Sequence, residues 1–422
     1  MNLPLALQNP SFRAFWGGTL ISVTGFQMLR FTQFWLIYDI TDSSLYIGYL
    51  ALASGIPTIV FNIIGGVYAD RLNQKMLVFT TQFLLALFIF ILCFLTFIGI
   101  VNEWHILLLA LLSGSVEAFD QPARRALYPS LIDREAIPSG VALLSGIWPG
   151  TRIISPAIAG FLIVWTSVAF AILISALGFL IMAIIALTLK VNFSPQQKNT
   201  SPLEDLLEGF SYINSHSIFK FIISITFFQS FFALAYIPMM PVIAKEVLTL
   251  GPEAQGILLG ASGLGALSTT IVIAIKPNLG SKFFHVVIGS FLSGISVIIF
   301  ALSSVLSGSY YLAIICMFIV GIFGTLPAIS AQSSLQLSVP NNLRGRIMGL
   351  YGLTFSLRPL SGFQAGLISG FTNPTFAIAF GGAALSIFTV TSFITNKNVR
   401  KFNQIIDMWH FTNCLSEHKP ML

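Results

Sequence analysis

The sequence predicts an all-α membrane protein with twelve transmembrane helices in two pseudo-symmetric six-helix halves, and with both termini in the cytoplasm. Three observations lead to this fold class: an apolar composition, twelve apolar runs of membrane-spanning length, and an internal repeat. Of the 422 residues, 55% are hydrophobic and 9% are charged, whereas soluble domains contain about 25% charged residues. This composition excludes a soluble enzyme, a nucleic-acid-binding protein and a disordered scaffold.

A helix needs about 20 apolar residues to cross the hydrocarbon core of a bilayer. Turn residues such as Asn102 and Asn373 separate the apolar runs. The first run is too long for the hydrophobic region of a signal peptide, which has about 7–15 residues. The predicted spans are 12–38, 45–69, 76–100, 104–127, 138–164, 168–189, 218–244, 254–275, 283–306, 309–331, 346–370 and 374–395.

The basic residues predict the orientation of these spans. With the N-terminus inside, 17 of the 21 Lys and Arg residues lie in cytoplasmic connections or termini, and only Lys245 lies on the opposite face. Cytoplasmic segments of membrane proteins carry such an excess of Lys and Arg. The net charge of +6 is therefore explained by topology and contact with anionic lipids, with no nucleic-acid partner.

The longest connection divides the chain into four parts. These are an N-terminal half (1–190), a cytoplasmic linker (191–217), a C-terminal half (218–396) and a polar cytoplasmic tail (397–422). Within the linker, Ser201, Pro202 and Glu204 have the spacing of a capped helix start. Leucines and Phe210 follow on one face, so we expect a short amphipathic helix at the membrane surface.

The two halves resemble each other at an offset of 206–207 residues. Lys75 matches Lys282, and the pair Arg152 and Gly160 matches Arg358 and Gly366. Because each half has an even number of predicted spans, both halves enter the membrane from the same side, as in a parallel repeat. Such a repeat is typical of transporters with a substrate site near the midplane, between the halves.

Residues 65–75 (GGVYADRLNQK) resemble the signature of the connection between spans two and three in the major facilitator superfamily, G-x-x-x-D-R-x-x-[RK]-[RK]. The resemblance implies a gating motif formed by Gly66, Asp70, Arg71 and Lys75, which stabilises the outward-facing state. It also implies that spans five and eleven pack against spans eight and two.

Residues 119–132 (FDQPARRALYPSLI) are similar to a segment of one branch of this superfamily, F-x-x-P-A-x-x-A-L-x-P-x-L-V, and residues 152–160 match its R-I-x-x-P-x-x-x-G pattern. This bacterial branch includes the enterobactin exporter and macrolide-efflux proteins. The resemblance implies a proton-driven exporter in the bacterial inner membrane. The chain departs from the related antiporter signature at Ser155 and Ala159, which replace glycines.

Five charged residues fall inside predicted spans: Arg30, Glu117, Asp120, Arg152 and Arg358. A charge at the centre of a membrane helix costs roughly 2.5–3.5 kcal/mol on insertion scales, so each needs a partner or a water-filled cavity. Glu117 and Asp120 share one stripe of span four with Arg124. Both acids are candidates for proton coupling. The alternatives are structural ion pairing with nearby arginines and direct substrate contact.

Polar side chains in spans one and seven are candidates for a substrate cavity, because the resemblance implies that spans one, four, seven and ten line it. These residues are Gln27, Arg30, Gln33, Gln229 and Tyr236. The alternative for span one is a hydrogen-bonded bridge to span four. The phenylalanines of span seven either line the cavity or face lipid. Arg124, Arg152 and Arg358 are candidate latches between the halves, with ligand contact as the alternative for Arg152 and Arg358.

The sequence contains no catalytic, nucleotide-binding or metal-binding motif, and its three cysteines form no CxxC pair. We therefore expect no enzymatic activity, no metal and no cofactor. The predicted function is proton-coupled export of a small amphiphilic molecule, such as a siderophore, a drug or a lipid-like metabolite. The expected partners are this substrate, protons and membrane lipids, with the chain as a monomer. An importer on the same scaffold is one alternative, and a membrane-embedded enzyme or sensor is a remote one.

Overall fold

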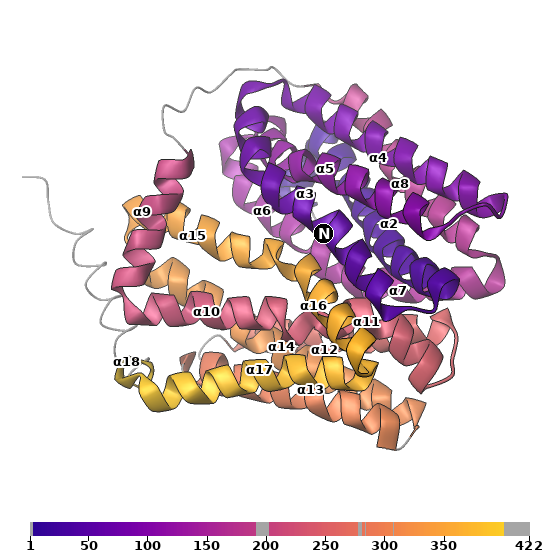
Figure 1. The fold of residues 1–422 in the computed structure, drawn as a ribbon. Helices are drawn as coiled ribbons and strands as arrows, with labels where there is room; N and C mark the ends of the chain where they lie inside the picture. The colour runs from indigo at the N-terminus through magenta and orange to yellow at the C-terminus, as the bar shows by residue number, and fades with distance from the viewer. Residues whose placement is uncertain (1–2, 191–201, 277–280, 283, 307, 401–422) are drawn as a thin grey trace, which may run out of the picture. The chain divides into compact units, whose positions relative to one another are not determined.

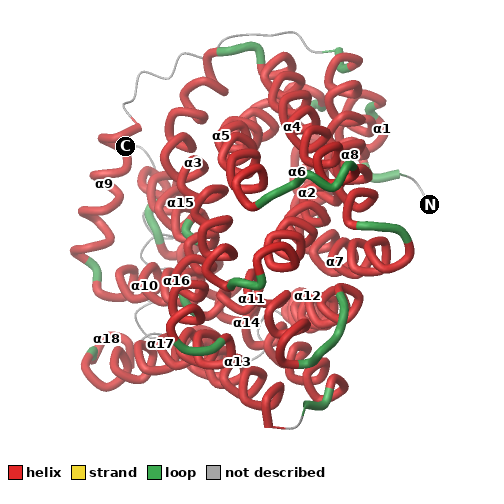
Figure 2. The backbone as a smooth tube through the Cα atoms, turned by 45° about the vertical axis from the view of Figure 1, so that its right-hand side comes forward, coloured by secondary structure: helices red, strands yellow, loops and turns green. Residues whose placement is uncertain are grey.

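The computed structural model of the chain describes residues 3–190, 202–276, 281–282, 284–306 and 308–400, and in these ranges it contains helices and no strand (Figure 2). Short turns connect most of the helices. The α-helices are α1 (Leu5–Gln8), α2 (Pro10–Thr41), α3 (Ser44–Arg71), α4 (Gln74–Phe97), α5 (Glu103–Leu127), α6 (Ile137–Ser145), α7 (Ile147–Trp165), α8 (Val168–Thr188), α9 (Pro202–Ser215), α10 (Ser217–Phe231), α11 (Tyr236–Val242), α12 (Pro252–Ile275), α13 (Gly289–Leu306), α14 (Tyr310–Ser338), α15 (Asn341–Ser356), α16 (Arg358–Phe371), α17 (Pro374–Thr395) and α18 (Lys397–Arg400).

Shorter helical segments of other types connect several of these helices. The 3₁₀ segments are η1 (Tyr128–Leu131), η2 (Arg134–Ala136) and η3 (Ala233–Ala235), and the π-helical segments are η4 (Ile243–Val247) and η5 (Phe284–Ile288).

Asparagine side chains begin several of the helices. The Asn9 side chain accepts hydrogen bonds from two backbone amides at the start of α2, and Asn373 does so once at the start of α17. At the start of α5, Asn102 and His105 each accept from the other's backbone amide. These side chains satisfy amides that have no partner inside the helix. The helices therefore begin where the sequence places turn residues.

Ten helical segments within the described ranges are long and apolar enough to cross a membrane. The predicted spans 12–38 and 346–370 are not among them. The first lies in α2, which has 32 residues but carries polar residues such as Ser22, Gln27 and Arg30 in its middle. The second is divided into α15 and α16, which meet at Leu357 and Arg358. The polar residues of the first segment lower its mean hydropathy, and the second is divided into helices of 16 and 14 residues, each shorter than a membrane span of about 20 residues.

The helix contacts divide the chain into two units, residues 1–199 with 240–263, and residues 200–239 with 264–422. In unit 1, α2, α4, α5 and α8 pack side by side (Figure 1), and α3 packs along α5. Small residues permit this packing: a Cβ atom at Gly25 of α2 would lie 2.8 Å from the carbonyl oxygen of Ser175 in α8. A Cβ atom at Gly114 of α5 would lie only 2.4 Å from the carbonyl oxygen of Ser54 in α3.

Unit 1 includes η4 and the first half of α12, which belong to the C-terminal half of the sequence. A Cβ atom at Gly160 of α7 would lie 2.5 Å from the carbonyl oxygen of Pro252, and one at Gly256 would lie 2.6 Å from that of Pro156. Glycine is required here because the two helix backbones touch. The fifth and eighth predicted spans therefore pack together, as the resemblance implies.

In unit 2, α13 packs between α14 and α17, and α10 contacts α15 and α17 (Figure 1). The predicted linker helix is α9, which begins at Pro202 and packs against α15 and α10. Ile213 is buried in this contact, and Glu208 forms an ion pair with Arg346 of α15. Phe210 remains exposed.

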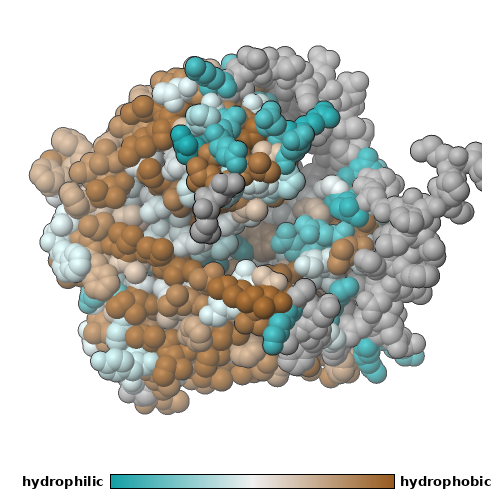
Figure 3. Space-filling view, turned by 180° about the vertical axis from the view of Figure 1, so that it is seen from behind, coloured by the Kyte–Doolittle hydropathy of each residue, from teal (hydrophilic) through white to brown (hydrophobic). Residues whose placement is uncertain are grey.

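Apolar side chains cover much of the surface. In Figure 3 they form broad brown areas, and the hydrophilic side chains gather in separate patches. Many of the exposed residues on the long helices are large and apolar, for example Phe94, Ile275 and Phe371. A surface of this kind is stable in contact with lipid, so the described helices have the surface expected of a membrane protein.

Candidate functional site

A small pocket inside unit 1 contains a charged pair. Arg30 of α2 donates from Nη1 to the Ser54 hydroxyl of α3 over 3.0 Å, and its Nη2 lies 3.9 Å from Oε2 of Glu117 in α5. The Arg30 guanidinium also lies over the Phe26 ring, 5.3 Å from its centroid. The pocket is lined by Phe26, Leu29, Arg30, Gln33, Ser54, Leu85, Ala110, Ser113, Gly114, Glu117 and Phe179.

The size of the pocket limits what it can hold. Its free volume is sufficient for about one or two water molecules. Binding sites for drug-sized molecules are about 300–1,000 Å³. In this conformation the pocket can hold water beside the Glu117 carboxylate, and a substrate of drug size does not fit.

The Glu117 carboxylate has few partners. At 3.9 Å its contact with Arg30 is longer than a hydrogen bond, and the described residues donate no hydrogen bond to it. Its side chain is 18% exposed. A carboxylate with one loosely held cation and little hydrogen bonding can gain and lose a proton without breaking a network.

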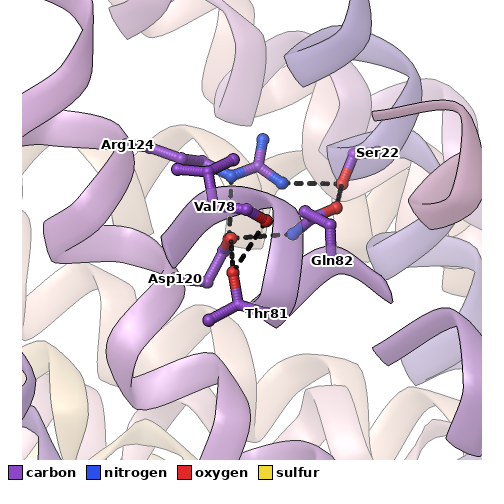
Figure 4. Close-up of polar contacts among 6 residues, drawn as sticks. All are labelled: Ser22, Val78, Thr81, Gln82, Asp120 and Arg124. Atoms are coloured by element: carbon purple, nitrogen blue, oxygen red, sulfur yellow. Dashed lines mark hydrogen bonds and ion pairs between the residues drawn. The ribbon is translucent and has the colours of Figure 1, made fainter. Parts of the chain in front are cut away.

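Asp120, one turn away on the same helix, has the opposite environment (Figure 4). Oδ1 accepts hydrogen bonds from Thr81 and from Gln82 Nε2, at 2.9 and 2.8 Å, and Oδ2 accepts from Arg124 Nε at 2.7 Å. Both oxygens of this carboxylate are therefore fully engaged.

The contacts of Asp120 belong to a closed ring of hydrogen bonds, which we call the polar ring: Ser22, Gln82, Asp120 and Arg124, with Thr81 attached. Ser22 donates to Gln82 Oε1 and accepts from Arg124 Nη2, each over 2.8 Å. All five side chains are buried. The polar ring connects α2, α4 and α5, and it fixes the turn of α5 that carries Glu117.

Arg124 retains one unsatisfied donor. Its Nη1 is buried and has no hydrogen-bond partner among the described residues. A buried donor without a partner costs about 1–3 kcal/mol. Arg124 nevertheless pairs with Asp120 of its own helix, inside unit 1.

Of the residues singled out from the sequence, Arg30, Gln33 and Glu117 line this pocket, and Asp120 and Arg124 belong to the polar ring. Sequence reasoning missed the neutral partners, which are Ser22, Ser54, Thr81, Gln82 and Ser113. Serine and threonine are common in membrane helices and carry no distinguishing signal. Gln82 was the detectable one, because an amide in the middle of the apolar run 76–100 needs a partner.

The remaining cavity candidates lie elsewhere. Gln27 is half-buried in α2 and does not line the pocket. Gln229 and Tyr236 belong to unit 2 and are buried. Gln229 donates from Nε2 to the carbonyl oxygen of Gly324, which ties α10 to α14.

Two phenylalanines in and just after α10 pack against α17. The Phe228 and Phe388 rings stack with their centroids 4.1 Å apart, and the Phe232 ring lies against the Phe380 ring. Their main role in this conformation is the packing of these two helices.

The gating motif is described only in part. Gly66, Asp70 and Arg71 lie in the last turns of α3, and the side chains of residues 62–71 are outside the described part of the structure. Lys75 donates from Nζ to the carbonyl oxygen of Leu189 over 2.8 Å. This ammonium caps the C-terminal end of α8, where the helix dipole favours a cation.

The two other candidate latch residues, Arg152 and Arg358, lie in α7 and α16. Arg152 is half-buried in α7. Arg358 is the exposed first residue of α16, and its guanidinium lies 4.4 Å from the centroid of the Phe355 ring.

A second charged cluster ties the end of α2 to η4; we call it the clasp. Lys245 Nζ lies 2.8 Å from Asp42 and 3.1 Å from Asp39, and the Tyr38 hydroxyl donates to the Glu246 carboxylate. The two aspartates are exposed and Tyr38 is buried. Sequence analysis had identified Lys245 only as the one basic residue on its face.

Comparisons with known proteins agree with these observations. A family described as transmembrane secretion effectors matches residues 4–417. The staphyloferrin A transporter of Staphylococcus aureus is 23% identical over 87% of this chain and 91% of its own. The enterobactin exporter EntS of Escherichia coli is 25% identical over 96% of both chains.

Solved structures show the same fold. The nucleoside transporter NupG has a TM-score of 0.63 at 15% identity, and it covers 97% of this chain and 99% of its own. A bacterial homologue of the lysosomal transporter Spinster, in an inward-facing conformation, has a TM-score of 0.65 at 14% identity, with coverage of 97% and 99%. This chain is therefore a multi-pass membrane transporter that belongs to the transmembrane secretion effector family of the major facilitator superfamily.

Proposed function

We propose that this chain exports a small amphiphilic molecule across a bacterial inner membrane, in exchange for protons, by alternating access. In this proposal it is a twelve-span monomer with both termini in the cytoplasm, and its partners are the substrate, protons and membrane lipids. Of the substrate classes predicted from the sequence, a siderophore is favoured, because two relatives over nearly the whole chain are named for staphyloferrin A and enterobactin.

The observation that supports proton coupling most strongly is the contrast between Glu117 and Asp120. Glu117 faces a water-sized pocket beside a loosely held arginine. Asp120 already accepts three hydrogen bonds, one of them from a charged partner. We therefore assign proton binding to Glu117. Asp120 is the weaker candidate, because its protonation would have to break the polar ring.

In the coupling cycle, protonation of Glu117 removes its negative charge and releases Arg30, which keeps its hydrogen bond to Ser54. Loss of the proton restores the attraction. A group that changes charge in this way biases two conformations only if its environment differs between them. Exchange with protons therefore requires the pocket to open to opposite sides of the membrane in turn.

For the substrate, we propose that Gln27, Arg30, Gln33, Gln229 and Tyr236 contact it in a cavity that forms in another conformation. The volume of the present pocket supports this restriction. The gating motif of Gly66, Asp70, Arg71 and Lys75, and the arginines 124, 152 and 358, are proposed to stabilise particular states of the cycle.

The test is a comparison of metabolites in the growth medium of wild-type and deletion cells, with and without iron. Export predicts that at least one compound disappears from the medium of the deletion strain and accumulates inside the cells. Complementation with the wild-type gene restores it. Accumulation of a compound in the medium of the deletion strain would instead indicate import, and an iron-independent compound would argue against a siderophore.

A further inference from the structure

The polar ring holds a buried charge pair next to Glu117, and the function proposed above does not use it. Asp120 lies three residues after Glu117 and Arg124 lies seven residues after it, so all three share one stripe of α5. In this order the negative member of the pair is nearer to Glu117 than the positive member.

On its other side, Glu117 faces Arg30. Among the described residues that line the pocket, those from α3, α4 and α8 are Ser54, Leu85 and Phe179, which carry no charge. The charges that act on Glu117 are therefore Arg30 from α2, and Asp120 and Arg124 from its own helix. Arg30 favours the ionised carboxylate and Asp120 favours the protonated form.

The polar ring keeps this balance fixed. Ser22, Thr81 and Gln82 hold the pair by four further hydrogen bonds, including the bond between Ser22 and Gln82. Because the ring is buried, solvent and salt screen its charges only weakly. By contrast, among the described residues the Arg30 guanidinium donates one hydrogen bond, to Ser54, and its ion pair with Glu117 is long. The Asp120–Arg124 pair is therefore held rigidly, and Arg30 is held less tightly.

We propose that the Asp120–Arg124 pair, held in place by Ser22, Thr81 and Gln82, sets the pH at which Glu117 exchanges its proton. These are positioning residues, which act through Glu117 and do not themselves carry the transported proton. The inference rests on the proposed role of Glu117 in coupling. It adds that movement of Arg30 against this fixed pair is what moves the proton.

The experiment follows the protonation of Glu117 directly. Infrared difference spectra of the purified full-length protein in nanodiscs are titrated with pH, and the carbonyl band that Glu117→Gln abolishes is assigned to Glu117. Removal of the negative charge by Asp120→Asn is expected to move the midpoint of this band to lower pH. Removal of the positive charge by Arg124→Gln is expected to move it to higher pH. The Asp120→Asn shift should be the larger of the two, because Asp120 lies three residues from Glu117 along α5 and Arg124 lies seven.

Two further variants separate charge from structure. The double variant Asp120→Asn/Arg124→Gln carries no charge and should return the midpoint close to the wild-type value. Thr81→Val removes one hydrogen bond from the ring without a change of charge, so it should lower stability and leave the midpoint in place. A ring with only a structural role would move the midpoint in neither single variant, or would move both in the same direction. Either result would overturn the proposal.

The single charge variants remove one member of a buried pair and can fail to accumulate. Ser22→Asp provides the same test, because it adds a carboxylate on the Arg124 side of the ring, where Arg124 Nη2 donates to Ser22 over 2.8 Å. It should move the midpoint to higher pH, and no shift would contradict the proposal. Failure of the proposed function is a different outcome: Glu117→Gln would then leave gradient-driven export intact, whatever the midpoints in the other variants.

Discussion

At the scale of single residues, the environment of each carboxylate decides its role more than its position in the sequence. Glu117 and Asp120 are both acidic residues inside a predicted span, and the sequence favours Glu117 as the proton carrier only because it lies deeper in that span. The spacing along α5 predicted correctly that Asp120 and Arg124 share a face. Of their ring partners, Gln82 was detectable as an amide inside an apolar run. Ser22 and Thr81 could not be predicted, because hydrogen bonds between helices depend on how α2, α4 and α5 pack.

Arg124→Gln should strongly lower the stability of the protein. It leaves the buried Asp120 without its charged partner, and loss of one member of a buried ion pair costs roughly 3–5 kcal/mol. Thermal unfolding of the purified protein in detergent measures the effect. The matched control is Arg125→Gln, because Arg125 is the adjacent residue and its side chain is exposed. Equal unfolding temperatures for the two variants would show that the buried pair contributes nothing.

At the scale of helices, close contacts in unit 1 tie segments from the two halves of the sequence together. The turn residues predicted the helix boundaries, and the family resemblance implied the packing of α7 against α12. The π-helical segment η4 and the clasp were not predicted. Their formation depends on which helix end lies beside η4, and no local pattern specifies this.

Gly256→Val should disrupt the contact between α7 and α12. A Cβ atom at Gly256 would lie 2.6 Å from the carbonyl oxygen of Pro156, so one backbone must move. We expect less folded protein in the membrane and lower transport, measured by quantitative size-exclusion chromatography and by a transport assay. Gly150→Ala in α7 is the control, since a Cβ atom there meets nothing within 4 Å. Wild-type behaviour of Gly256→Val would contradict the observed packing.

Lys245→Gln should weaken the clasp without unfolding the protein, because Lys245 and its two aspartates are largely solvent-exposed and such pairs contribute little stability. The expected effect is on the equilibrium between a closed state, which the clasp would stabilise, and a state that is open to the outside of the cell. A cysteine introduced at the buried Ser155, in a background without native cysteines, should react faster with a polar thiol reagent added from outside the cell. The charge-swapped variant Asp42→Lys/Lys245→Asp should restore slow labelling. Unchanged labelling in Lys245→Gln would show that the clasp does not hold a closed state.

At the scale of the whole molecule, composition and hydropathy predicted a helical membrane protein, and the internal repeat and the family resemblance predicted a transporter. Ten of the predicted spans meet the criteria of length and hydropathy in the described residues. The spans 12–38 and 346–370 do not, and the first of them carries Ser22, Arg30 and Gln33, which belong to the polar ring or line the pocket. The polar residues that lower the hydropathy of α2 are therefore the ones that build the candidate site.

The central claim is that Glu117 couples proton movement to export. The most direct test is a proteoliposome assay with wild-type protein and the Glu117→Gln variant, in which a trapped pH-sensitive dye reports proton flux while substrate movement is measured. The account predicts that wild-type protein moves protons when substrate is added. It also predicts that a pH gradient no longer drives substrate transport in Glu117→Gln, although the variant is folded and still exchanges substrate. Full gradient-driven transport by Glu117→Gln would contradict the account.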